Sequence, residues 1–227
     1  KTYYVMVDGS ALNSQGFFDI TIDDYSPITP FPSGPLNYDL FANAVTLSVP
    51  TATGAGGKTT SALAHNYCSG TEASEPDSWT LYDIDNTVWW KFTVPTTGIY
   101  TGQHVDMTLR LLSDPGGTKN DGVNLLGAVY ELNGSASFPN LTNIATGTNI
   151  LLYDEDITLT CLTPGKTYYL QVDGYSGPFN IFRAQGQGYY KVELEATTLT
   201  PNQGNDSVCG AITIPVNAVG VNTYYPT

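Results

Sequence analysis

Apolar and polar residues alternate along several short stretches of the chain. In residues 167–172, Tyr168, Leu170 and Val172 fall on one face of an extended strand, while Tyr169 and Gln171 fall on the other. A period of two, rich in aromatic and branched residues, predicts a half-buried β-strand. The same pattern predicts strands at residues 17–22, 45–49, 88–95, 99–112, 125–132, 150–153, 157–162 and 189–196.

The stretches between these strands carry turn residues rather than helical patterns. Residues 51–60 are rich in Gly and Thr, residues 66–79 are polar and irregular, and residues 114–124 are rich in Gly, Asp and Asn. No stretch has an apolar period of 3.6. Many short strands with Gly, Pro and Asn turns predict an all-β chain, folded as an antiparallel, jelly-roll-like β-sandwich.

Two segments of the sequence occur twice. Lys1-Thr-Tyr-Tyr-Val-Met-Val-Asp-Gly9 matches Lys166-Thr-Tyr-Tyr-Leu-Gln-Val-Asp-Gly174 at seven of nine positions, 165 residues apart. With one deletion, residues 37–49 also resemble residues 205–216. A fixed internal spacing of this kind predicts tandem repeats.

The repeats suggest a division of the chain into four parts. Residues 1–23 are the C-terminal end of a preceding repeat, and residues 24–35, which contain four prolines, form a stiff linker. Residues 36–197 form a complete β-sandwich repeat. Residues 198–227 are a linker and the start of the next repeat, in which Cys209 stands where the complete repeat has Phe41.

Composition narrows the classes of partner. Of the 227 residues, 41% are hydrophobic, which is enough for a sizeable core, and the formal net charge is −13. The chain lacks the basic patch that nucleic-acid binding requires, so we expect no nucleic-acid partner. No apolar run is long enough to span a bilayer, so we expect no membrane insertion.

Three motifs follow one another in a fixed order: Glu72-Ala-Ser-Glu-Pro76, Val88-Trp-Trp-Lys-Phe-Thr-Val-Pro-Thr-Thr-Gly98 and the segment from Cys161 to Gly174. This order resembles the tandem repeats of large cell-surface proteins of the Bacteroidota, which are similar to pre-peptidase C-terminal (PPC-like) β-sandwich domains. The resemblance covers most of residues 36–197.

The resemblance implies an extracellular, cell-surface protein, secreted by the type IX route, that acts as an adhesin or extracellular filament. Its partners would be neighbouring repeats or identical subunits, and surface glycans are a further expectation. Two alternatives stay open: a carbohydrate-binding module of a secreted multidomain protein, and an accessory PPC-like domain of a secreted hydrolase.

The sequence favours a chain that is not an enzyme. It contains no GxSxG, HExxH or P-loop motif, and neither His65 nor His104 lies near a recognisable nucleophile motif. We expect His65 to lie in a polar loop and His104 on a strand surface. Two carboxylate pairs, Asp83 with Asp85 and Asp154 with Asp156, are candidate Ca²⁺ ligands because calcium prefers oxygen donors. Acidic residues that cap strand ends are the favoured alternative for each pair.

Three smaller hypotheses concern individual residues or pairs of residues. Trp79 and Tyr82, in a polar loop, are candidates for stacking on sugars. The alternative is that these aromatic residues attach the loop to the sandwich. Ser207 lies in an Asp-Ser-Val sequence that resembles a Bacteroidota O-glycosylation motif. Cys68 and Cys161 lie in one repeat and are a candidate disulfide in an extracellular setting. Free buried thiols are the alternative for the cysteines.

Overall fold

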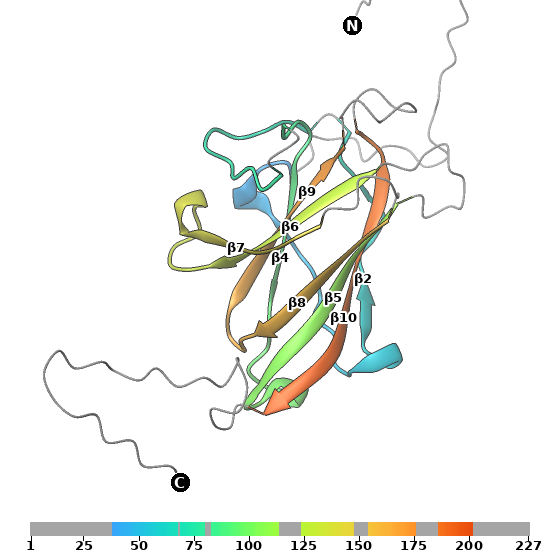
Figure 1. Ribbon diagram of the computed structural model, residues 1–227, viewed down its shortest axis with the longest axis vertical. Coiled ribbons are helices and arrows are strands. Elements are labelled where there is room, and N and C mark those ends of the chain that lie inside the picture. The colour runs from blue at the N-terminus through green and yellow to red at the C-terminus, as the bar shows by residue number, and fades with distance from the viewer. Residues whose placement is uncertain are drawn as a thin grey trace, which may run out of the picture. The chain divides into compact units, whose positions relative to one another are not determined.

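The computed structural model describes residues 38–67, 69–79, 83–113, 124–147, 154–175 and 186–201. The chain divides into two units, Lys1–Pro35 and Leu36–Thr227, and all of the described residues belong to the second. Within them the fold is all-β, with ten strands in two sheets and no α-helix (Figure 1). The prediction of a β-sandwich is therefore confirmed. The described part of the chain contains no helix that would be able to cross a membrane.

The first sheet, sheet A, has five strands in the order β1-β4-β9-β6-β7. Their bounds are β1 Val45–Thr46, β4 Val88–Thr93, β9 Thr167–Gly174, β6 Leu125–Leu132 and β7 Leu141–Thr146. All neighbours in this sheet are antiparallel except β1 and β4, which pair in parallel. Every other strand pairing in the described sandwich is antiparallel, as predicted.

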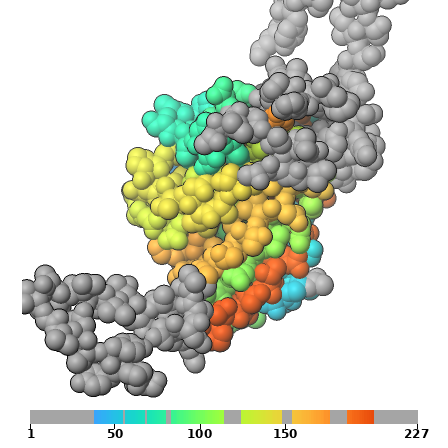
Figure 2. Space-filling model, viewed as in Figure 1, coloured from blue at the N-terminus to red at the C-terminus, as the bar shows by residue number. Residues whose placement is uncertain are grey.

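The second sheet, sheet B, has the order β2-β10-β5-β8, and β3 also pairs with β10. The bounds are β2 Lys58–Thr60, β10 Tyr189–Pro201, β5 Gln103–Ser113, β8 Glu155–Leu162 and β3 Ala64–His65. Four single-turn 3₁₀ helices connect the strands: η1 Phe41–Asn43, η2 Gly54–Gly56, η3 Gly98–Tyr100 and η4 Phe138–Asn140. In Figure 2 the atoms of β8, β5, β10 and β2 lie side by side in orange, green, red and cyan.

The main core lies between the two sheets and follows the predicted alternation. From β4, Trp90 and Phe92 point inward, and from β5, Met107 and Leu109 do the same. Complete burial of one such side chain contributes about 1.5–3 kcal/mol. The Trp90 indole also donates a hydrogen bond of 2.9 Å to the Tyr190 hydroxyl, so its one polar atom is satisfied inside the core.

Most predicted strands are present, with some shifted ends. The prediction for 125–132 coincides with β6, and β10 extends five residues beyond the predicted end at 196. The predicted strand 99–112 begins instead as η3, and β5 starts at Gln103. The sequence did not predict β7, β2 or β3, which lie in segments rich in Thr, Gly, Asn or Ser. The predicted strands 17–22 and 150–153 lie outside the described residues.

Candidate functional site

The outer face of sheet A is covered, so this sheet is buried on both sides. A second apolar cluster lies there, centred on Trp89 of β4 and Tyr169 of β9; its other members are Phe41, Ala44, Trp79, Leu126, Ala128, Tyr130 and Tyr175. The cover consists of η1 and of the irregular segment 69–79. We call residues 69–79 the cover segment. In Figure 2 its teal atoms adjoin the yellow atoms of the β6–β7 hairpin. Trp89 is thus completely buried, although it points away from the main core.

Glu75 attaches the cover segment to the sheet. Its Oε1 accepts hydrogen bonds from the Trp89 indole N–H, at 3.0 Å, and from Nε2 of Gln171, at 3.1 Å. Its Oε2 accepts a third, from the backbone N–H of Glu72, at 2.7 Å. The neighbouring Glu72 accepts from the backbone N–H of Phe41, at 2.6 Å. One buried carboxylate therefore joins the cover segment to two adjacent strands of sheet A.

Gln171 extends this network toward β6. Its Nε2 also donates to the carbonyl of Pro76, at 3.0 Å, and its Oε1 accepts from the Tyr130 hydroxyl, at 2.7 Å. The Tyr130 hydroxyl in turn lies 2.7 Å from Oγ of Ser78 in the cover segment. Burial raises the pKa of Tyr130 to about 12, so its hydroxyl remains a hydrogen-bond donor at neutral pH.

Asp173, the penultimate residue of β9, holds the start of β4 in the same way. Its Oδ2 accepts from the backbone N–H of Asp85, and its Oδ1 from that of Asn86, both at 3.0 Å. Oδ1 also accepts from the backbone N–H of Gly174, at 2.7 Å. The carboxylate thus satisfies three backbone donors that lie in irregular or strand-end structure.

Burial dominates the titration of both carboxyl groups. It raises the pKa of Asp173 from 3.8 to about 6, although the three backbone hydrogen bonds oppose the shift. It also raises the pKa of Glu75. Both residues are almost completely inaccessible to solvent. Both carboxylates accept several hydrogen bonds in the fold, although burial makes their charged form less favourable.

The three sequence motifs therefore meet at one place. Glu75 comes from the first, Trp89 from the second and Gln171 from the third, and they are directly hydrogen-bonded. We call these three residues the Glu75 cluster. With every polar atom of its carboxylate facing a donor from the fold, the cluster fastens one layer of the protein to another. The sequence alone did not predict that these three residues are in contact.

The candidate calcium ligands are exposed, and several of their atoms serve the fold. Oδ1 of Asp154 accepts from the backbone N–H of Ser113, at 2.8 Å, and Asp156 lies 3.5 Å from Nε of Arg110. Asp83 and Asp85 are exposed before β4. The described residues include no group of three or more His, Cys, Asp or Glu side chains placed to hold a metal ion. The contacts of Asp154 correspond to the strand-end role that the sequence analysis favoured.

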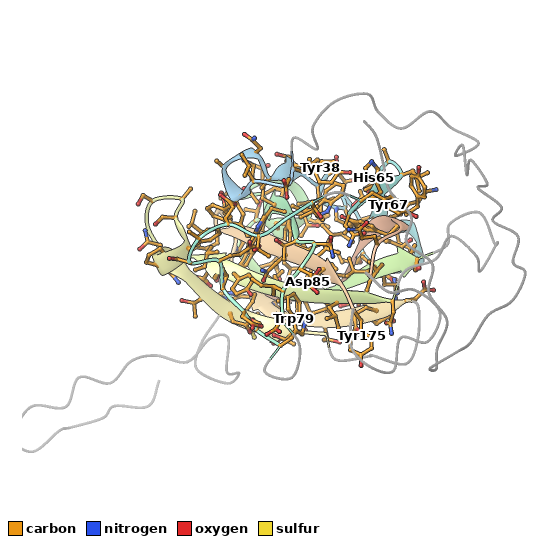
Figure 3. All side chains as sticks on the ribbon, turned by 90° about the horizontal axis from the view of Figure 1, so that it is seen from above. Tyr38, His65, Tyr67, Trp79, Asp85 and Tyr175 are labelled. Atoms are coloured by element: carbon orange, nitrogen blue, oxygen red, sulfur yellow. The ribbon has the colours of Figure 1, made fainter. Side chains whose placement is uncertain are left out.

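Trp79 is the last residue of the cover segment, and its side chain belongs to the buried apolar cluster rather than to an exposed loop. Its side chain is 5% exposed, and its indole N–H donates to the carbonyl of Gly147, at 3.3 Å. Figure 3 shows it on the same side of the sandwich as Tyr175, another member of this cluster. The expectation of a sugar-stacking Trp79 is corrected accordingly, since a buried ring offers no face to a ligand. Tyr82 and Ser207 lie outside the described residues.

The cysteine and histidine predictions have different outcomes. Cys161 is disulfide-bonded. Cys68 and Cys209 lie outside the described residues, so the pairing with Cys68 stays a prediction. His65 is buried in β3 rather than placed in a polar loop, and its ring lies against those of Tyr67 and Tyr189. Figure 3 shows His65 and Tyr67 beside Tyr38. Burial lowers the pKa of His65. His104 lies in β5, on a strand as expected.

The outer face of sheet B carries a row of ion pairs. Nζ of Lys58 lies 3.1 Å from Glu193 and 3.3 Å from Glu195. Nη1 of Arg110 lies 2.9 Å and 2.6 Å from the same two carboxylates. Two cations from β2 and β5 thus flank two acidic side chains of β10, and the row links three adjacent strands.

The chain matches no protein-family model, and a search of curated proteins finds no match either.

Proposed function

We propose that this chain is a structural and adhesive repeat of a long secreted bacterial surface protein or extracellular filament. One observation carries the proposal: the nine-residue motif that occurs twice corresponds to β9, and its recurring residues are the ones whose contacts define the fold. A motif that carried chemistry would place reactive side chains at its recurring positions. Here the recurring positions are occupied by packing and anchoring residues.

The first recurring positions lie just before and at the start of β9, which begins at Thr167. Nζ of Lys166 pairs with Glu131, at 2.9 Å, and the Thr167 hydroxyl lies 2.8 Å from that of Thr93. Tyr168 stacks on Phe92 in the main core, with ring centroids 5.4 Å apart. The corresponding residues of the first copy are Lys1, Thr2 and Tyr3.

The remaining recurring positions are equally constrained. Tyr169 packs on Phe41 under the cover segment, at a centroid distance of 4.5 Å, and Val172 is buried in the main core. Asp173 binds the start of β4. At Gly174, a Cβ atom would collide with the carbonyl of Gly186, so only glycine fits. These constraints explain why the same residues would recur in a second copy of the same fold.

The two positions that differ support this interpretation. Leu170 is replaced by Val5, and both are apolar residues suited to a core position. Gln171 is replaced by Met6, which is unable to donate to a glutamate. A β-sandwich with a different attachment of its cover is thus the expected structure for the copy that precedes the described one.

An antibody raised against the chain tests the proposal. On immunoblots of the cells that make the protein, we expect a polypeptide many times longer than 227 residues. On intact cells we expect surface labelling that external protease removes. A polypeptide about the size of one repeat, protected inside the cell, would refute the proposal.

A further inference from the structure

The first and last segments of the described sandwich run in the same direction. The first contains β1, at the edge of sheet A, and the last is β10, which lies between β2 and β5 in sheet B. The segment 38–50 begins beside the start of β10: the Tyr38 hydroxyl accepts from the N–H of His65, and His65 pairs with Tyr189. It ends where β5 begins, since the hydroxyl of Tyr100, just before β5, donates to the carbonyl of Pro50. β10 covers the same span, and its last residue, Pro201, pairs with Gln103.

The described part of the sandwich therefore begins at one end of the strands and finishes at the other. Tyr38 lies at the end where β10 starts, and Pro201 lies at the end where it finishes. β10 has 13 residues. At about 3.3 Å per residue, the two ends are separated by roughly 40 Å along the strands. Figure 1 shows β10, in orange-red, running down the sandwich beside β5.

Attachments along its whole length hold the segment 38–50. The Tyr38 carbonyl accepts from the N–H of Trp89, at 2.8 Å, and the N–H of Leu47 donates to the carbonyl of Lys91, at 2.7 Å. Between these contacts β1 pairs with β4 in parallel. Four residues of the segment, Phe41, Ala44, Leu47 and Pro50, are also buried.

β10 is held more extensively. Eleven of its residues pair with β5, and three pair with β2 on its other side. The N–H of Ala196 donates to the carbonyl of Gly57, at 3.1 Å, and the N–H of Ser61 donates to that of Val192, at 2.8 Å. Glu193 and Glu195 add the ion pairs with Lys58 and Arg110 across both neighbours.

We propose that this unit bears tension along its strands, because both of its terminal segments are loaded in shear. A pull on the two ends of the chain acts parallel to β1 and to β10. The bonds to the neighbouring strands then share the load and must fail together. A pull across a strand would instead break its pairs one at a time. The proposal rests on the proposed function, since a repeat in a surface fibre is pulled through its two ends.

Single-molecule force spectroscopy on the full chain tests this proposal with two attachment geometries. In the first, handles at the N- and C-termini pull along the strands. In the second, one handle is attached through an azide-bearing amino acid at Thr101, an exposed residue two positions before β5, and the other stays at the C-terminus. This pair of handles pulls Pro201 away from Gln103 and peels β10 from β5. Reducing buffer prevents the Cys161 disulfide from carrying load.

We expect the first geometry to require a several-fold higher unfolding force than the second at the same loading rate. Forced unfolding depends on the barrier along the pulling direction and not on total stability, so the same folded chain serves as its own control. In the first geometry, an extension of roughly 550 Å identifies the unfolding of residues 38–201, and in the second an extension of roughly 350 Å identifies the unfolding of residues 101–201. Urea unfolding of the Thr101-labelled chain, with an unchanged midpoint, verifies that the label leaves the fold intact.

Equal forces in the two geometries, or a weaker first geometry, would overturn the proposal. The immunoblot and surface labelling tell this failure apart from failure of the proposed function. If the protein is long and exposed on the cell surface but the unit unfolds at low force in the first geometry, only the load-bearing role is refuted. If the protein is small and intracellular but the unit resists force along its strands, the mechanical property is supported and the proposed function is refuted.

Discussion

Asp173 makes the stability of this protein depend on pH in a direction opposite to that of a typical paired carboxylate. Its carboxyl group is buried, and burial raises its pKa to about 6. Protonation therefore occurs more readily in the folded protein than in the unfolded chain. The contribution to stability is fully present below the unfolded value near 3.8 and is lost as the pH rises through 6.

The size of the effect follows from the two pKa values. The difference between 3.8 and about 6 corresponds to about 3 kcal/mol of unfolding free energy, at about 1.4 kcal/mol for each pKa unit. About 2 kcal/mol of this lies between pH 4.5 and pH 7.5. Glu75 acts in the same direction because burial raises its pKa as well. These two groups therefore stabilise the chain as the pH falls across this range, whereas His65, whose pKa is lowered by burial, acts in the opposite direction.

Urea unfolding followed by tryptophan fluorescence, at several values between pH 4.5 and pH 7.5, measures this dependence. Asp173→Asn isolates the contribution of one group, because an amide does not titrate. The difference in unfolding free energy between wild type and variant should change by about 2 kcal/mol across the range. Asp156→Asn, at an exposed carboxylate beside Arg110, is the matched control. A constant difference for Asp173→Asn would refute the reasoning, because the three backbone hydrogen bonds would then balance burial.

Three further predictions concern other parts of the fold. Gln171→Met introduces the residue that the first copy of the nine-residue motif has at this position. It should lower the unfolding free energy by about 2–4 kcal/mol, since it removes buried hydrogen bonds to Glu75, Pro76 and Tyr130. A loss below 1 kcal/mol by urea unfolding would contradict this. Reduction of the Cys161 disulfide should cost about 2–5 kcal/mol. A peptide map without reductant then identifies its partner, and a Cys161–Cys209 peptide would exclude the predicted Cys68. Dialysis against EDTA should leave the melting temperature unchanged, because the described candidate ligands form no cluster; a fall of several degrees would restore the calcium hypothesis.

Strand positions were predictable wherever side-chain alternation was strong. β6 and β9 pack against neighbours on both faces, so long apolar and aromatic runs mark them in the sequence. β7 was missed because it is an edge strand whose residues, such as Thr142 and Asn143, are exposed. An edge strand is defined by its backbone pairing, and its side chains leave little apolar signal.

The Glu75 cluster was beyond sequence reasoning for a different reason. Its members lie far apart in the chain, and each has an ordinary alternative: Glu75 as a solvated loop residue, Trp89 as a strand-surface ring and Gln171 as a polar strand residue. Only the folded arrangement makes one carboxylate the acceptor for both side chains. One signal was present, however. Trp89 and Tyr169 are large aromatic residues on the face opposite the main core, which indicates that a second layer covers them.

A comparison of the matching segments distinguishes positions that face the main core from positions that lie under the cover. Residues facing the main core are conservatively exchanged or identical between the copies, as with Leu170 and Val5. The exchange of Gln171 for Met6, and of Phe41 for Cys209 in the other matching segment, falls under the cover segment. Phe41 contacts Trp89 and Tyr169 there. In the proposed array, neighbouring repeats would share the sandwich, while the way in which the outer layer is fastened would vary from one repeat to the next.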